Sequence, residues 1–183
     1  MSTGTNPQRN RFRDEPLRRL VTHLLQNPDA AHTEYHARTE LLEGLQCAIN
    51  IRDFGPVPVD EPAALGGADS APSPAELILG ALGTCQEVMY ATYAALLDIP
   101  LEAVSVEVHG TLNLQGLFAL DESVHPGYEH IRFETAIRSP ADPESIRQLS
   151  RLVEAHCPVV DTLVRGVSVA GQVYLNGDLA VEG

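Results

Sequence analysis

Residues 73–85 of the 183-residue chain read SPAELILGALGTC, and this run predicts the start of the long helix on which the fold depends. Ser73 is a favoured N-cap residue, and Pro74 fits the first helical position. Glu76 completes a Ser-x-x-Glu capping box, in which two side chains satisfy the free N–H groups at the helix start. The helix is expected to run to about Leu97, because the residues that follow lead into a proline.

The segment Leu77–Leu97 is mostly apolar and long enough to resemble a membrane span. Gln86 and Glu87 stand at its centre, where a charge in hydrocarbon costs about 3 kcal/mol. We therefore expect a buried core helix and no association with a membrane. Apolar residues recur along it at three- and four-residue steps. They predict a core-facing stripe of Ile78, Ala81, Cys85, Val88, Thr92 and Leu96.

A second helix is predicted further along, because Asp142-Pro143 repeats the pattern of a cap followed by a proline. This helix is expected to reach Cys157, where Pro158 either kinks it or begins a short new helix to Val164. The two helices thus each present one cysteine to one core. Both cysteines could be small apolar fillers or a reactive pair, and the pattern leaves the two alternatives open. The predicted core stripe of the second helix is Ile146, Leu149, Val153 and Cys157.

Alternating apolar residues on either side of the two helices predict β-strands. The longest connection is a Gly/Pro/Ala/Ser loop at residues 61–74. The order strands, helix, strands, helix, strand predicts an α+β fold with antiparallel strands and two core helices. The predicted strands are two within Tyr35–Phe54 that turn near Glu43-Gly44, a short piece at Val57–Asp60, a pair at Val104–Leu114 and Tyr128–Arg138, and a last strand at Val167–Leu175.

Residues 1–34 are predicted to be an N-terminal extension, and residues 35–183 the main domain. The extension should contain one short helix at Arg18–Gln26, where apolar residues share one stripe before Asn27-Pro28 stops it. Its first ten residues are polar and show no apolar period, so we expect them to be disordered.

The charge balance excludes several kinds of function. A net charge of −13 argues against a nucleic-acid partner, which needs a cationic footprint. The basic residues are twelve arginines and no lysine, so Schiff-base and P-loop chemistry are excluded. Nothing near the N-terminus resembles a signal peptide, and we expect a cytoplasmic protein. In that reducing compartment Cys47, Cys85 and Cys157 should be thiols.

Other short motifs carry little weight. Gly166–Ala170 nearly matches a nucleophile elbow but lacks the final glycine, and its alternating valines predict a strand. His32 and His36 would lie about 13 Å apart along an extended chain, too far to share a zinc ion. His156 should point about 100° away from Cys157 around the helix, so a Cys–His pair is not expected there. We therefore expect neither a metal nor a cofactor.

Several of these runs together resemble the OsmC/Ohr family, named for osmotically inducible protein C and organic hydroperoxide resistance protein. The similar segments are Val59–Pro62, Leu65–Gly67, Ser73–Cys85 and Ala155–Val159. The resemblance implies an intertwined homodimer that reduces organic hydroperoxides. Cys85 would attack the peroxide as a thiolate, and Cys157 would resolve the resulting sulfenic acid to a disulfide. A dithiol reductant, lipoyl-type or another small thiol, would then reopen that disulfide.

The family also implies an arginine and a glutamate at the peroxide site. Arg52 is our candidate for the arginine, with Arg38 as second choice, although a solvated strand charge explains Arg52 equally well. The family's glutamate position is Ala75 in this chain. Glu76 lies nine residues before Cys85, about 900° around the helix, and so on the opposite face. A dimeric small-molecule-binding or redox-sensing protein without efficient turnover therefore stays open as an alternative.

Overall fold

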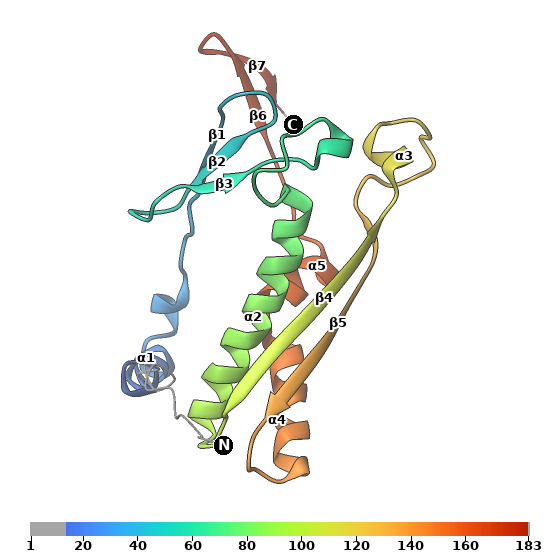
Figure 1. Cartoon of the computed structure of the whole chain (residues 1–183). Coiled ribbons are helices and arrows are strands. Elements are labelled where there is room, and N and C mark those ends of the chain that lie inside the picture. Colours follow the sequence, from blue (N-terminus) through green and yellow to red (C-terminus); the bar gives the residue numbers. More distant parts are fainter. Residues whose placement is uncertain (1–13, 183) are drawn as a thin grey trace.

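The computed structural model describes residues 14–182, and its central element is the long helix α2 (Pro74–Leu96) (Figure 1). The hairpin of β4 (Ala103–Leu112) and β5 (Tyr128–Arg138) runs along one side of α2. Helix α4 (Pro143–His156) and helix α5 (Pro158–Arg165) pack against α2 as well. This arrangement confirms the predicted α+β fold.

Three small antiparallel sheets account for the described strands. The first contains β1 (Arg38–Leu41), β2 (Cys47–Asn50) and β3 (Val57–Val59) in that order, and β1 and β2 meet at the predicted turn. Gly44 in that turn has a φ of 58°, a conformation that glycine adopts without strain. The second sheet is the β4–β5 hairpin, and the third pairs β6 (Gln172–Leu175) with β7 (Asp178–Glu182).

The helix starts agree with the local sequence. Ser73 caps α2 and forms a reciprocal capping box with Glu76. Asp142 caps α4 by accepting hydrogen bonds from two backbone N–H groups of the first turn, those of Glu144 and Ser145. At Pro158 the chain begins a new helix, so the second of the two predicted alternatives is correct.

The core is small and lies between α2, α4 and the β4–β5 hairpin. Its buried members are Tyr90 and Ala94 of α2 with Leu149 and Val153 of α4. The stripe predicted for α4 is therefore confirmed.

The core-facing stripe predicted for α2 is wrong, because two of its members are exposed in the single chain. Ile78 is 43% exposed and Val88 is 62% exposed. Apolar residues surround most of α2, so their period does not select one face. The residues of α2 that are buried are Leu82, Gly83, Gln86, Tyr90 and Ala94.

Helix α1 (Asp14–Gln26) includes the predicted N-terminal helix and begins four residues earlier. The Arg18 guanidinium contacts the end of α2, where it donates to the carbonyls of Ala95 and Leu96 and pairs with Asp98 at 2.7 Å. A short 3-10 helix, η2 (Pro28–Ala31), follows α1. The prediction of disorder for the first ten residues lies outside the described part of the chain.

The closing strand differs from the prediction. Residues 167–171 form no strand, and pairing begins only at Gln172. Asn176-Gly177 then turns the chain, with φ values of 55° and 100°, into the unpredicted strand β7. Two positive φ values at Asn-Gly are typical of the tightest β-hairpin turn, so this hairpin follows from its sequence.

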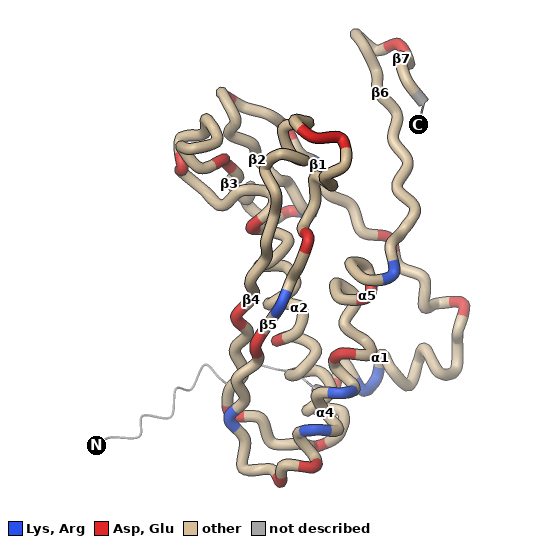
Figure 2. The backbone as a smooth tube through the Cα atoms, turned by 90° about the vertical axis from the view of Figure 1, so that its right-hand side faces the viewer, with Lys and Arg blue, Asp and Glu red and all other residues tan. Residues whose placement is uncertain are grey.

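The connections contain two further short helices, η3 (Ala63–Leu65) and α3 (Leu114–Leu117). Several arginines of the described chain lie at the end of the molecule that carries α1 and α4 (Figure 2). There Arg138 pairs with Glu102 at 3.0 Å, and Arg147 pairs with Glu144 at 2.8 Å. Among the helices that the structure describes, none combines the length and apolar character needed to cross a bilayer.

Candidate functional site

The structure brings Cys85 and Cys157 together. Cys85 lies in the middle of α2, and Cys157 lies between α4 and α5, 72 residues later in the chain. Their Sγ atoms are 3.2 Å apart and share a hydrogen bond, and both cysteines are free thiols. Cys157 is fully buried, whereas Cys85 is half-buried. A disulfide needs a separation of about 2.05 Å, so the sulfurs must approach by roughly 1 Å to form one.

The break between α4 and α5 positions the second cysteine. Cys157 ends α4 and is also the N-cap of α5, with an extended backbone conformation (φ −73°, ψ 114°). Pro158 enforces this break because proline disfavours a helical conformation in the residue before it. Helix α5 packs against α2, and the backbone of Val159 in its first turn acts on the pKa of Cys85.

Three influences act on the ionisation of Cys85. Burial raises the pKa of the Cys85 thiol, because a charge is poorly solvated there. The hydrogen bond from the Val159 N–H opposes burial and lowers that pKa. The neighbouring Cys157 raises the pKa further, first through the hydrogen bond between the two thiols and then through repulsion between two negative sulfurs. The net result is a pKa above the usual thiol value.

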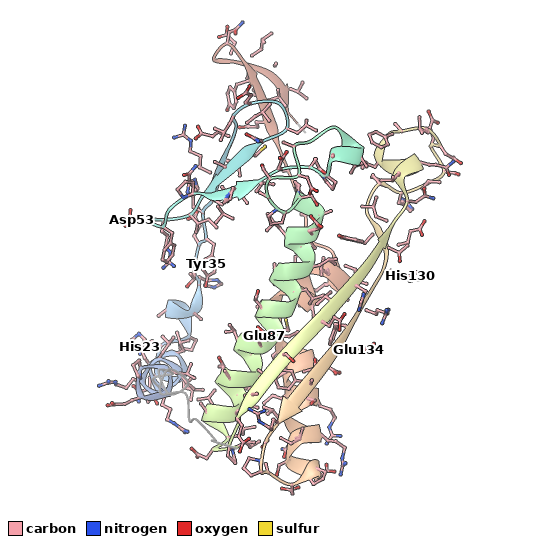
Figure 3. The ribbon with its side chains drawn as sticks, viewed as in Figure 1. His23, Tyr35, Asp53, Glu87, His130 and Glu134 are labelled. Atoms are coloured by element: carbon pink, nitrogen blue, oxygen red, sulfur yellow. The ribbon has the colours of Figure 1, made fainter. Side chains whose placement is uncertain are left out.

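Neither predicted arginine contacts Cys85 within the chain. Arg52 stands in the turn after β2 with a φ of 50°, and its guanidinium lies over the Phe54 ring, 4.6 Å from the centroid. The next residue, Asp53, marks this turn at the tip of the sheet, away from α2 (Figure 3). Arg38 is exposed on β1, opposite Asn50. In the described part of the chain no arginine influences the pKa of Cys85.

The two glutamates of α2 are engaged elsewhere. Glu76 Oε2 accepts hydrogen bonds from the Ser73 N–H at 2.7 Å and from the Ser73 hydroxyl at 2.9 Å. These two bonds hold the pKa of Glu76 below its usual value. Glu87 points from α2 toward β4, where its Oε1 accepts from the Val106 N–H at 3.3 Å (Figure 3). Glu76 is therefore a helix cap in this structure.

An apolar groove of about 550 Å³ lies between α2, β5 and α5; neither Cys85 nor Cys157 lines it, but Leu82 and Val160, three residues from Cys85 and Cys157 respectively, do. Ile78 lines it from α2 and precedes Cys85 by seven residues, so the two residues share one helix face. His130 and Glu129 of β5 are polar members of the lining. Most of the remaining lining is aliphatic or aromatic, from Leu82, Ile131, Phe133, Val160, Leu163 and Val164.

The other residues considered from the sequence lie apart from this pair. Cys47 is on β2, where its sulfur contacts the Leu45 carbonyl at 3.7 Å. The His156 ring packs against the Tyr93 ring at 6.0 Å instead of contacting Cys157. Residues 166–170 form no strand–turn–helix element of the kind that a nucleophile elbow requires. Across residues 14–182, no group of three side chains could hold a metal ion.

Two features of the site were not predicted. The backbone N–H of Val159 lowers the pKa of Cys85, and the helix start at Pro158 is the sequence signal for N–H groups near the cysteines. Gln86, next to Cys85, is fully buried, and neither atom of its amide has a hydrogen-bond partner among the described residues. A buried glutamine within an apolar helix indicates either a functional role or a loss of folding stability.

Solved structures similar to this chain include an OsmC-like protein from Mycoplasma pneumoniae, with 20% identity and a TM-score of 0.63 over 74% of this chain and 89% of that one. An organic hydroperoxide resistance protein OsmC from Legionella pneumophila has 20% identity and a TM-score of 0.56. The match covers 74% of this chain and 93% of that one. An organic hydroperoxide resistance protein from Elizabethkingia anophelis has 16% identity and a TM-score of 0.56. The match covers 73% of this chain and 91% of that one. At these identities the likeness shows the fold.

No curated protein sequence matches the chain significantly. The family model described as OsmC-like protein matches residues 67–170. This match includes Cys85 and Cys157 and extends over more than half of the chain. The protein therefore belongs to the OsmC-like protein family.

Proposed function

We propose that this protein is a thiol-dependent reductase of organic hydroperoxides. The observation that carries the proposal is the 3.2 Å separation of the Cys85 and Cys157 sulfurs on two different helices. The OsmC-like family includes proteins described as organic hydroperoxide resistance proteins, which agrees with this chemistry. Free thiols and a dithiol reductant fit a reducing compartment, and we propose the cytoplasm.

The proposed cycle assigns one step to each cysteine. The Cys85 thiolate attacks an oxygen of the hydroperoxide, the O–O bond breaks, and the alkoxide leaves as an alcohol after taking a proton. Cys85 is thereby oxidised to a sulfenic acid. The Cys157 thiol attacks that sulfur, a disulfide forms, and water leaves. A dithiol reductant restores both thiols by two exchange steps and is itself oxidised to a disulfide.

The apolar groove supports an organic substrate. Its aliphatic and aromatic lining can bury the carbon chain of a hydroperoxide, and Leu82 brings this lining to within one helical turn of the half-buried Cys85. Hydrogen peroxide has no apolar group to bury there and would gain nothing from this lining. We therefore propose alkyl or aryl hydroperoxides as the substrate class.

We also propose that the working unit is a homodimer in which Arg52 serves the site of the other subunit. Within one chain Arg52 rests on Phe54, and no arginine acts on Cys85. A guanidinium near the thiolate would lower its pKa and orient the peroxide, so its delivery by a second copy would complete the chemistry. Arg38 of the neighbouring strand is the second candidate.

The decisive experiment is steady-state reduction of cumene hydroperoxide with dihydrolipoamide as reductant. We expect turnover with the wild type, none with Cys85→Ser, and loss of the disulfide-forming step with Cys157→Ser. Cys47→Ser is the matched control, because Cys47 lies on β2 away from the pair, and it should keep full activity. Peptide mapping after one equivalent of hydroperoxide should find a Cys85–Cys157 disulfide. Absence of turnover in the wild type would overturn the proposal.

The raised pKa of Cys85 favours a second candidate, a redox-sensing or small-molecule-binding protein without efficient turnover. A thiol that is mostly protonated near neutral pH reacts slowly with peroxide. This alternative expects one oxidation event per chain and no steady-state consumption of hydroperoxide in the experiment above.

A further inference from the structure

The carboxamide of Gln86 has unused hydrogen-bonding capacity inside the protein. The side chain is fully buried, and among the described residues neither its N–H groups nor its oxygen has a hydrogen-bond partner. Native proteins satisfy most of their buried polar groups, because an unpaired one costs stability. An exception in the residue next to Cys85 therefore indicates a role in the chemistry of the cysteine pair.

Gln86 lies in the same layer of the helix packing as Cys157. Helices α2 and α4 run antiparallel (Figure 1), and Tyr90 of α2 packs with Val153 of α4 in the core. Gln86 shares the buried face of α2 with Tyr90 and precedes it by one helical turn. Cys157 follows Val153 by one turn, toward the same end of the molecule. The 3.2 Å contact between the sulfurs of Cys85 and Cys157 confirms that this part of α2 meets the end of α4.

The attack of Cys157 on oxidised Cys85 is the step that lacks a stabilising group. In that step the Cys157 sulfur bonds to the Cys85 sulfur and the S–O bond of the sulfenic acid breaks. The Cys157 thiol proton leaves with the oxygen as water. Negative charge develops on the Cys157 sulfur as its proton departs. Because Cys157 is fully buried, solvent water does not stabilise that charge.

We propose that Gln86 is a catalytic residue of this resolving step, in which its side-chain N–H donates a hydrogen bond to the Cys157 sulfur. The inference rests on the proposed function and adds the group that assists a buried thiol as nucleophile. In the reduced protein the carboxamide donates to neither sulfur, so this hydrogen bond forms only as the two sulfurs approach each other. A donor that is unpaired in the ground state and paired in the transition state lowers the barrier of the step.

A single-turnover measurement on two variants tests the donor. Gln86→Leu and Gln86→Met each place an apolar side chain of similar size in the core and remove both N–H groups. Each reduced full-length protein is mixed with one equivalent of cumene hydroperoxide, and samples are quenched over time with dimedone and a thiol-blocking reagent. Mass spectrometry then gives the amounts of Cys85 sulfenic acid, as its dimedone adduct, and of the Cys85–Cys157 disulfide.

The two steps should respond differently to the loss of the carboxamide. Oxidation of Cys85 should stay within about twofold of the wild-type rate, since Gln86 takes no part in it. Disulfide formation should slow by about ten- to hundredfold, the effect of losing one hydrogen bond to a charged group, and the sulfenic acid should accumulate. In the steady state kcat should fall, while kcat/KM for the hydroperoxide stays unchanged because it reports the oxidation step.

Disulfide formation within about twofold of the wild-type rate in either folded variant would overturn the inference. Gln86→Met provides the decision if Gln86→Leu does not fold. Thr135→Val is the matched control, because the Thr135 hydroxyl on β5 is likewise buried without a partner among the described residues. This control also removes an unpaired polar group from the interior and should leave disulfide formation unchanged. Equal slowing in Thr135→Val would mean that a more rigid interior causes the effect, and would also overturn the inference.

The proposed function and the role of Gln86 can fail separately. A wild-type protein that forms the disulfide once and consumes no further hydroperoxide would remove the reductase, while slower disulfide formation in the Gln86 variants would still support the inference. Steady turnover in a protein whose disulfide forms equally fast without the carboxamide would do the reverse. Absence of the disulfide in the oxidised wild type would overturn both.

Discussion

Gln86 directly follows the proposed nucleophile and is among the most deeply buried side chains of the chain. Both its amide atoms lack partners among the described residues, as does the buried hydroxyl of Thr135 on β5. An unpaired buried polar group costs about 1–3 kcal/mol because its hydrogen bonds to water are lost on folding. Gln86 therefore makes the folded protein less stable than an apolar residue of similar size would at the same position.

Gln86→Leu should therefore raise the free energy of unfolding by about 1–3 kcal/mol, since leucine has a similar length and no polar group to desolvate. The measurement is urea unfolding of the reduced protein. Gln148→Leu is the control, because Gln148 is exposed on α4 and should change stability by less than about 0.5 kcal/mol.

A loss of stability in Gln86→Leu would contradict this expectation and would mean that the carboxamide is hydrogen-bonded in the folded protein, as by a buried water molecule. Assaying hydroperoxide turnover in the same variant separates stability from function. A more stable protein with at least about tenfold lower turnover would show that the carboxamide serves the cysteine pair.

The elements show how far a sequence determines its own structure. Both helix starts were predictable to the residue, because the Ser73 and Asp142 caps act within one turn. The buried face of α2 was not, because apolar residues surround this helix and only its tertiary neighbours select a face. The proximity of Cys85 and Cys157 could be predicted from the confirmed stripe of α4 together with the family resemblance. The location of Arg52 could not be predicted, because it depends on the conformation of the turn after β2, which the local sequence does not determine.

The loop between β3 and α2 is organised by one buried carboxylate. Asp60 is 1% exposed and accepts hydrogen bonds from the N–H groups of Glu61, Ala68 and Ser70 and from the Ser70 hydroxyl at 2.7 Å. The Ser70 hydroxyl and N–H are the main cause that lowers the pKa of Asp60 to about 2. Gly67 completes the loop, because a Cβ there would lie 1.8 Å from the Glu61 carbonyl oxygen.

Asp60→Asn should lower the Tm at neutral pH by at least about 3 °C, because an amide accepts these hydrogen bonds less well than a carboxylate. The depressed pKa means that the stabilisation is fully present above pH 4 and is lost as the pH falls toward 2. The Tm difference between wild type and variant should therefore shrink over that range. Asp69→Asn, on the exposed part of the same loop, is the control and should match the wild type throughout. A difference that does not depend on pH would contradict this role for the carboxylate.

At the scale of the whole molecule, one chain leaves much apolar surface uncovered. Its total accessible surface, polar and apolar together, is 14119 Å², whereas a compact monomer of 19.8 kDa exposes roughly 8,600 Å². Among its exposed apolar side chains are Leu120, Val164 and Val169. The β6–β7 hairpin extends beyond the core, and Figure 1 shows it projecting past the end of α2. Val173, Tyr174 and Leu175 are each more than half exposed there. Such apolar surface is typical of a chain whose remaining core is completed by another copy.

We therefore expect a stable dimer of about twice 19.8 kDa by sedimentation at micromolar concentration. The disulfide should nevertheless form within each chain, because the two sulfurs of one chain already lie 3.2 Å apart. After treatment with hydroperoxide, a non-reducing denaturing gel should then show single chains, while the native mass stays that of the dimer. A stable monomer would contradict the interwoven assembly. A covalent dimer on the gel would instead mean that Cys85 and Cys157 pair between subunits, and the proposed cycle would lose its resolving step within the chain.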